Sequence, residues 1–169
     1  MTHFIIIAGA PGSGKTTISN LLKTRLNESP LIDFGWIRQF HLDPEWKKAS
    51  KKEEQMSFEN LVFILKNYAK YGYKNIIIND LQDQRIQQIP KLFSKYNYTI
   101  ISLIVKDDTE LKSRILSERD SGFKNVKKAL TWNKELIRRK NLKNECKIDN
   151  THTNPSKTVK IILEILKQK

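Results

Sequence analysis

Short apolar runs alternate along this chain with longer segments in which apolar residues recur every three or four positions. A run of four to eight apolar, mostly β-branched residues is typical of a strand that is buried on both faces of a sheet. Runs of this kind predict strands at residues 4–8, 30–33, 75–80 and 98–105, and a short mixed segment predicts a fifth at 145–149.

Segments with helical spacing separate the predicted strands. The clearest covers residues 56–71, where an apolar stripe predicts a helix that packs one side into the core and ends at Gly72. Residues 43–53 are polar and predict a short exposed helix or a loop. Further helices are predicted from residue 17, over about 84–95, from 107–110 to about 120, over about 126–140 and over 156–167.

This alternation of strands and helices predicts an α/β fold with a five-stranded parallel sheet that is covered by helices on both faces. The crossovers between parallel strands are expected to be right-handed. Ligands of such sheets bind at the carboxyl ends of the strands, so we expect the functional residues there. Because the chain has no internal repeat and no linker, residues 1–169 are expected to form a single domain.

A phosphate-binding loop joins the first predicted strand to the first predicted helix. Residues 9–16 have the sequence G-x-x-x-x-G-K-T in the strand–loop–helix context that this motif requires. The N–H groups of such a loop surround a phosphate, the lysine reaches the β- and γ-phosphates, and the threonine hydroxyl binds Mg²⁺. The chain is therefore predicted to bind a nucleoside triphosphate. The residues that we expect to hold it are Gly9, Ala10, Pro11, Gly12, Ser13, Gly14, Lys15, Thr16 and Thr17.

The chain carries 31 Lys and Arg against 18 Asp and Glu, a formal net charge of +13. This excess fits either an anionic partner or a lysine-rich composition without a specific role. Many of the lysines are scattered singly along the predicted helices, which favours the second interpretation for most of the charge. The single cysteine, Cys146, excludes an internal disulfide. No apolar run reaches the length of a membrane span, so we expect a cytoplasmic protein without membrane contact.

The phosphate loop and the order of the parts that follow it resemble the nucleoside and nucleotide kinase superfamily of P-loop proteins. The chain is most similar to its short single-domain phosphotransferases: gluconate- and shikimate-kinase-like enzymes, chloramphenicol phosphotransferase, the tunicamycin-resistance type of ATP-binding protein and the kinase module of polynucleotide kinases. The resemblance covers nearly the whole chain, and only the phosphate loop is specific by itself. It implies a three-layer α/β/α P-loop NTPase fold, with ATP as phosphoryl donor and Mg²⁺ as its counterion.

The resemblance also implies an acceptor side for the site, covered by residues of about 34–71. Asp33 ends the second predicted strand and would accept the proton of the acceptor hydroxyl or orient that hydroxyl; the alternative is a strand-end Asp that caps the next turn. Arg38 would clamp an anionic or polar acceptor, or it is an ordinary surface arginine. Asp80 would hold Mg²⁺ through water or face the acceptor. Trp36 would contact a flat or ring-bearing acceptor, unless it belongs to the core.

The same covering segment contains other aromatic or ring-bearing side chains that could contact the acceptor or lie in the core. These are Phe34, Phe40, His41, Trp46 and Phe58. The loop at 149–151 is expected to lie beside the adenine base, with no catalytic role.

Residues of about 114–128 resemble the lid of this superfamily, in which arginines close over ATP and stabilise the charge on the transferring phosphoryl group. Arg114 and Arg119 would supply these guanidinium groups here. Their separation of five positions means that they do not share one helix face. Surface ion pairs with Glu110 or Glu118 are the alternative for both arginines.

Three functions follow from these predictions. The favoured one is transfer of the γ-phosphoryl group of Mg-ATP to a hydroxyl or phosphate of a small molecule, such as a nucleoside or nucleotide, a sugar acid or an antibiotic, with Lys15, Asp33, Arg114 and Arg119 as catalytic residues. A nucleic-acid 5′-end kinase is the second, motivated by the charge and the aromatic residues, but the dispersed basic residues do not favour it. A resistance or regulatory protein that binds ATP without catalysis is the third. The sequence indicates neither the acceptor nor an oligomeric state.

Overall fold

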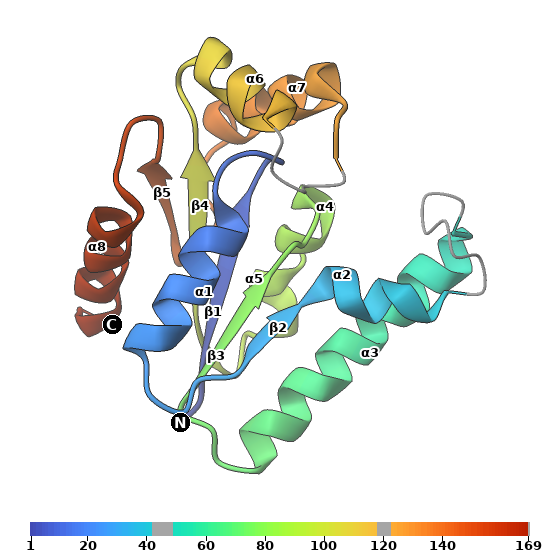
Figure 1. The fold of residues 1–169 in the computed structure, drawn as a ribbon. Coiled ribbons are helices and arrows are strands. Elements are labelled where there is room, and N and C mark those ends of the chain that lie inside the picture. Colours follow the sequence, from blue (N-terminus) through green and yellow to red (C-terminus); the bar gives the residue numbers. More distant parts are fainter. Residues whose placement is uncertain (42–48, 118–122, 169) are drawn as a thin grey trace.

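The structure of the protein is a computed structural model that describes residues 1–41, 49–117 and 123–168. A five-stranded sheet forms its centre, all of its strand pairs are parallel, and the strand order is β2-β3-β1-β4-β5 (Figure 1). The strands are β1 (His3–Gly9), β2 (Leu31–Asp33), β3 (Asn75–Asn79), β4 (Asn97–Ile104) and β5 (Glu145–Asp149). The predicted α/β fold and its five strands are confirmed.

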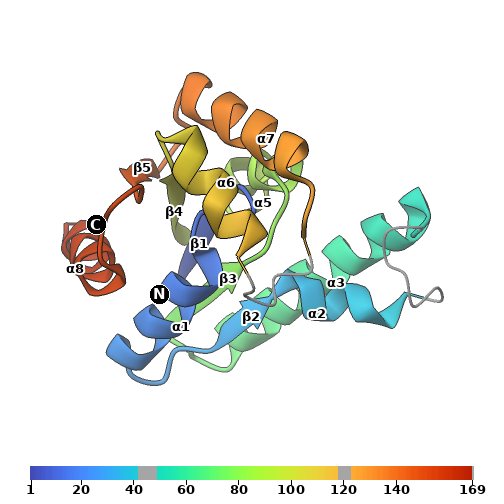
Figure 2. The same ribbon diagram turned by 45° about the horizontal axis from the view of Figure 1, so that its top comes forward.

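Helices cover both faces of the sheet. Helices α1 and α8 pack on one face, α3, α4 and α5 pack on the other, and α6 and α7 lie over the carboxyl ends of the strands (Figures 1 and 2). The helical segments are α1 (Lys15–Arg25), α2 (Phe34–Ile37), the 3₁₀ turn η1 (Arg38–Phe40), α3 (Lys51–Lys70), α4 (Asp83–Ile86), α5 (Ile89–Leu92), α6 (Asp108–Leu116), α7 (Val126–Arg138) and α8 (Pro155–Lys167). None of these described helices combines the length and the apolar character needed to cross a membrane.

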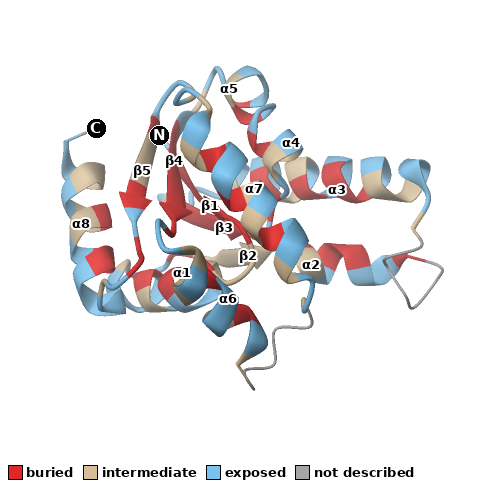
Figure 3. Ribbon diagram, turned by 90° about the horizontal axis from the view of Figure 1, so that it is seen from above, coloured by how far each residue is buried: buried red, intermediate tan, exposed pale blue. Residues whose placement is uncertain are grey.

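The central strand β1 shows why an uninterrupted apolar run predicts this architecture. Successive side chains of a strand point to opposite faces of a sheet. Phe4 and Ile6 pack into the core under α3, α4 and α5, whereas Ile5 and Ile7 pack into the core under α1 and α8, and all four are fully buried. Figure 3 shows the inner strands as buried and the outer sides of the helices as exposed. Both faces of β1 must therefore be apolar.

Helix α3 begins at Lys51, five positions before the predicted start at residue 56. A capping box explains the earlier start, because the Ser50 hydroxyl accepts a hydrogen bond from the Glu53 N–H and the Glu53 carboxylate accepts one from the Ser50 N–H at 2.9 Å. The sequence pattern S-x-x-E, which indicates a helix start, lies in the polar segment. The spacing of apolar residues gives no information about helix boundaries there. Residues 51–53, which were predicted to belong to a short exposed helix or a loop over 43–53, instead form the first turn of α3, and residues 43–48 of that prediction lie outside the described residues.

The helix predicted over about 84–95 is also wrong, because the structure has two single turns there, α4 and α5. Pro90 lies in the first turn of α5. A proline disfavours helical backbone at the preceding residue and lacks an N–H, so it starts a new turn more readily than it continues one. The helix predicted to reach about residue 120 ends at Leu116 in α6, since Ser117 has extended backbone.

Candidate active site

The phosphate loop lies between β1 and α1 at the carboxyl edge of the sheet (Figure 1). Gly12 and Gly14 have φ angles of 81° and 96°, in the left-handed region that favours glycine. A Cβ atom at Gly12 would lie 2.9 Å from Ile115 of α6, and one at Gly14 would lie 2.9 Å from the Asn150 side chain. The loop is therefore closely packed on two sides, by α6 and by the segment that follows β5.

Asn150 fixes the loop from the side of β5. Its buried side-chain amide donates a hydrogen bond of 2.8 Å to the carbonyl of Ser13, and its carbonyl oxygen accepts one of 2.7 Å from the Thr158 hydroxyl of α8. The backbone N–H of Asn150 donates to the Ile104 carbonyl of β4. From the sequence, this segment was expected only beside the adenine base. The position of Asn150, a polar residue just after a strand at the carboxyl edge of the sheet, could have indicated this further role.

Lys15, the first residue of α1, points its ammonium group back across the loop. Its Nζ donates to the Ala10 carbonyl at 3.3 Å and lies 6.0 Å from the centre of the Trp132 ring of α7. Burial lowers the pKa of Lys15, while the carboxylates of Asp80 and Asp33 act in the opposite direction. The proximity of Trp132 was not predicted, because no pattern in the sequence links α7 to the loop.

Asp33 and Asp80 converge at the carboxyl ends of the neighbouring strands β2 and β3. Asp33 is paired in register with Asn79, and Asp80 follows directly with a φ of 60°. The Asp33 carboxylate accepts a 2.8 Å hydrogen bond from the Gly35 N–H and so caps α2. A Cβ atom on Gly35 would lie 3.0 Å from a carboxylate oxygen of Asp33 and 3.0 Å from one of Asp80. Both carboxylates therefore border the same small space.

The electrostatics of Asp80 reflect this crowding. Removal of water by the surrounding protein raises the pKa of Asp80, and Asp33 raises it further by charge repulsion, whereas Lys15 and Arg38 lower it. Asp80 keeps an exposed face, so this removal of water is partial. Two carboxylates, an ammonium and a guanidinium thus interact at one edge of the sheet. A cation between the carboxylates would relieve their repulsion.

The residues around the loop fit a magnesium nucleotide. Mg²⁺ usually takes one or two carboxylates together with waters and phosphate oxygens. Asp80 offers such a carboxylate, and Thr16 and Thr17 are exposed in the first turn of α1. Within residues 1–41, 49–117 and 123–168 no group of three or more His, Cys, Asp or Glu side chains could hold a metal ion. Asp80 and the exposed threonines fit Mg²⁺ that is also bound by phosphate oxygens, and the desolvated Lys15 fits the phosphate itself.

Arg38, the predicted acceptor clamp, is held by α3. Its Nε and Nη2 lie 2.8 and 2.7 Å from the same carboxylate oxygen of Glu54, and its guanidinium carbon lies 5.9 Å from the centre of the Phe34 ring. The Arg38 residue is 8% exposed. The ion pair with Glu54 was not predicted from the sequence, because the two residues belong to separate elements.

The aromatic residues of the covering segment divide into two groups. Phe34 and Phe58 are buried and pack edge to face with their ring centres 6.3 Å apart, so both belong to the core. His41 is buried and hydrogen bonded to the Ser57 hydroxyl at 2.8 Å. By contrast, Trp36 and Phe40 are 74% and 81% exposed. Among the described side chains that were predicted to contact the acceptor, Trp36 and Phe40 therefore offer exposed rings to a ligand.

The predicted lid arginine Arg114 lies at the end of α6. Its Nε donates to Glu110 at 2.7 Å, which is the helical ion pair considered as the alternative, and its Nη2 donates to the Thr151 carbonyl after β5. The structure therefore brings Arg114 to the segment that holds the phosphate loop, and its catalytic role stays a prediction. Arg119 and Trp46 lie outside the described residues.

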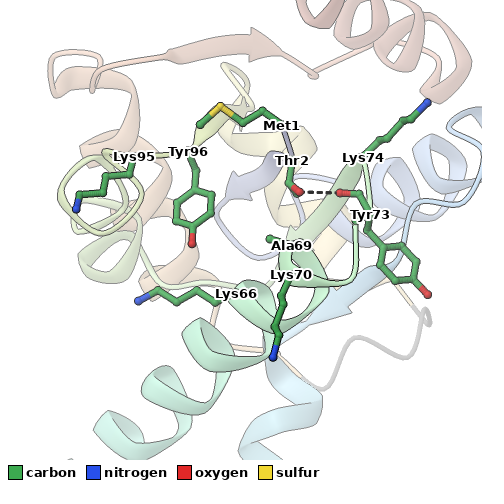
Figure 4. Close-up of a pocket in the computed structure, with 10 residues that line it drawn as sticks. Met1, Thr2, Lys66, Ala69, Lys70, Tyr73, Lys74, Lys95 and Tyr96 are labelled. Carbon is green, nitrogen blue, oxygen red and sulfur yellow. Dashed lines mark hydrogen bonds between the residues drawn. The ribbon is translucent and has the colours of Figure 1, made fainter.

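A hollow of about 450 Å³ lies at the opposite, amino-terminal edge of the sheet (Figure 4). It is bordered by Thr2, whose hydroxyl donates to the Tyr73 carbonyl, and by several lysines. In Figure 4 the side chains of Lys70 and Lys74 extend in different directions, and those of Lys66 and Lys95 extend together toward another side. This hollow is separate from the phosphate loop.

Comparison with known proteins places the chain in a family. The model of the family described as AAA domain matches residues 5–147, most of the chain, and the chain belongs to that family. The fold is that of the P-loop nucleotide kinase-like proteins. A comparison with curated protein sequences finds no match.

Three solved structures illustrate the shared fold. A sugar kinase from Janibacter sp. has a TM-score of 0.72 at 14% identity, with 99% of this chain and 95% of that chain covered. A gluconokinase from Sinorhizobium meliloti has a TM-score of 0.69 at 12% identity, with 98% and 92% covered. Thymidylate kinase from Candida albicans has a TM-score of 0.66 at 19% identity, with 99% and 92% covered. At these identities the likeness concerns the fold.

Proposed function

We propose that the protein is a kinase that transfers the γ-phosphoryl group of ATP, bound with Mg²⁺, to a small-molecule acceptor. The observation that carries this proposal is the convergence of Asp33, Asp80 and Lys15 beside the phosphate loop. Phosphoryl transfer depends on positioning and on charge stabilisation rather than on covalent chemistry by the protein. An ammonium and two carboxylates next to a phosphate loop supply both.

The donor side consists of the loop and the first turn of α1. The loop N–H groups and Lys15 hold the phosphates, and the Thr16 hydroxyl and Asp80 hold the metal ion. When bound, Mg²⁺ neutralises charge on the phosphate oxygens. Asn150 keeps the loop in the conformation that presents these groups, through its hydrogen bond to Ser13.

The acceptor side consists of Asp33 and the segment that follows it. Asp33 orients the acceptor hydroxyl or accepts its proton. Either role requires only that one Asp33 carboxylate oxygen lie within hydrogen-bond distance of that hydroxyl. Trp36 and Arg38 border the space that the acceptor enters. Arg114 and Arg119 stabilise the transferring phosphoryl group from the lid. We place the protein in a reducing cytoplasm, in keeping with the free thiol of Cys146.

Acceptor-stimulated ADP release tests this proposal. Mg-ATP is offered with pools of nucleosides, nucleoside monophosphates, sugars, sugar acids, hydroxylated antibiotics and 5′-hydroxyl oligonucleotides. We expect one small-molecule pool to raise ADP release in the wild type and in Lys23→Met, which changes another lysine of α1, but not in Lys15→Met. Stimulation by the oligonucleotides alone supports an end kinase instead, and ATP binding without stimulation supports a non-catalytic protein.

A further inference from the structure

The charged residues on the acceptor side bear on which acceptors can bind. This inference rests on the proposed kinase function. Arg38 is the guanidinium that interacts with Asp80, and it would be the natural partner of a phosphate or carboxylate on the acceptor. Two of its donor nitrogens, however, already contact one carboxylate oxygen of Glu54 at 2.7 and 2.8 Å. The ion pair is largely buried, with side chains 9% and 24% exposed. An anionic acceptor would have to compete with Glu54.

A second arginine near this pair is also held by α3. Arg85, in α4, donates to the Gln55 side chain at 2.8 Å and to the Glu54 backbone carbonyl at 3.4 Å. Its guanidinium carbon lies 4.6 Å from the centre of the Phe58 ring. Both arginines therefore serve to attach α3 to the elements around the site. An anion that binds either guanidinium must therefore share it with groups of α3.

Other groups that the described residues bring to the acceptor side are carboxylates and apolar rings. Asp33 and Asp80 border one small space and repel each other there. Carboxylates accept hydrogen bonds from hydroxyl groups, whereas they repel phosphates and carboxylates. The segment that begins at Asp33 also exposes Trp36 and Phe40, which offer apolar area to an uncharged ring.

We propose that the acceptor is a hydroxyl compound without negative charge, and that the Arg38–Glu54 ion pair excludes anionic acceptors. A nucleoside then fits better than its monophosphate, and a sugar fits better than its sugar acid. Glu54 acts here as a specificity-determining residue, because it occupies the guanidinium that an anion would need. The acceptor hydroxyl is bonded by Asp33, and the rest of the molecule lies against the exposed rings.

Matched acceptor pairs test the inference directly. Acceptor-stimulated ADP release is measured for nucleosides against their 5′-monophosphates and for sugars against their acids, and kcat/KM is compared within each pair. We expect the wild type to prefer the uncharged member about tenfold or more, a difference that a single uncompensated charge contact readily produces. Preference for the anionic member overturns the inference and leaves the kinase activity standing. If no member of any pair stimulates ADP release, the proposed function falls and the inference falls with it.

A variant pair tests the part assigned to Glu54. Glu54→Gln removes the charge that occupies Arg38, so we expect the preference for uncharged acceptors to fall about tenfold or more. Glu59→Gln makes the same change on an exposed face of α3, where the Glu59 carboxylate accepts a hydrogen bond from the Gln55 side chain, and it should leave the preference unchanged. The ratio of two acceptors on one enzyme is insensitive to partial loss of folded protein. An unchanged ratio in Glu54→Gln overturns the assignment.

Discussion

Substitution of Asn150 by Asp isolates the contact that anchors the phosphate loop. The change keeps the shape of the side chain and keeps an oxygen for the Thr158 hydroxyl, but it replaces the donor that lies 2.8 Å from the Ser13 carbonyl. A carboxylate oxygen would then face a carbonyl oxygen in a buried position. Leaving a buried acceptor without its partner costs about 1–3 kcal/mol, and more where a charge is involved, so we expect a loss of about 2–4 kcal/mol.

The loss should appear in two measurements. Urea unfolding at pH 7 gives the free energy of unfolding, and calorimetry gives the affinity for Mg-ATP, which should fall about tenfold or more because the loop is no longer held. A protonated Asp could donate to Ser13 again, so the deficit should narrow as the pH is lowered.

Asn154→Asp is the matched control. Asn154 caps α8 by accepting a hydrogen bond from the Ser156 N–H, and a carboxylate serves equally well there. The control should keep its stability and its ATP affinity. If Asn150→Asp matches this control within about 0.5 kcal/mol and binds Mg-ATP as tightly, the assignment of Asn150 as an anchor is refuted.

Three further predictions concern single side chains. Gly35→Ala places a methyl group 3.0 Å from both site carboxylates, so acceptor-dependent ADP release should fall about tenfold or more, while the unfolding free energy changes by no more than about 1 kcal/mol. Glu145→Gln removes the charge that pairs with Arg139 through contacts of 2.6 and 2.8 Å, and should cost about 1–3 kcal/mol at pH 7 in urea unfolding, because Arg139 keeps its ion pair with Asp83. Burial alone would raise the pKa of Glu145, but the hydrogen bonds it accepts lower it, so its contribution is complete above the ordinary value of 4.5 and is lost as the pH falls below that value. Tyr98→Phe removes a buried hydroxyl that has no hydrogen-bond partner among the described residues, and should raise the unfolding free energy by up to about 1 kcal/mol.

Each of these predictions has an outcome that contradicts it. Full activity in Gly35→Ala would mean that the space between the carboxylates is not used. A deficit in Glu145→Gln that persists unchanged at pH 3 would mean that the charge of Glu145 contributes nothing. A clear loss of stability in Tyr98→Phe would mean that the hydroxyl has a partner that the structure does not describe.

The strands of the sheet could be predicted from short apolar runs, because a strand that is buried on both faces needs apolar residues at successive positions. The run at Ile5–Ile7 had to be apolar at every position, since alternate residues enter different cores. The predicted helix boundaries were wrong where one or two residues decide where a helix starts or ends, whatever the spacing of the apolar residues. Pro90 divides a segment with helical composition, and the Ser50–Glu53 capping box starts α3 in a stretch without apolar residues at helical spacing.

The site was predictable to the extent that it is contiguous in the sequence. The phosphate loop is one continuous motif, and Asp33 and Asp80 could be placed because strand ends of a parallel sheet meet at one edge. The bond between Asn150 and Ser13 joins residues 137 positions apart, and the pair that occupies Arg38 depends on how α3 packs. Such partners are set by tertiary packing, and no local pattern encodes them.

Transfer of labelled γ-phosphate to the acceptor by Asp33→Asn tests the central claim most directly. Asn keeps an oxygen to cap α2 but lacks the charge that orients the acceptor or takes its proton, whereas Asp107→Asn makes the same change at the cap of α6, a residue to which the proposal gives no role. We expect transfer by Asp33→Asn to fall about a hundredfold or more, with Mg-ATP affinity retained and Asp107→Asn unaffected. Transfer at the wild-type rate in Asp33→Asn would contradict the account, because the carboxylate beside the phosphate loop would then play no part in the reaction.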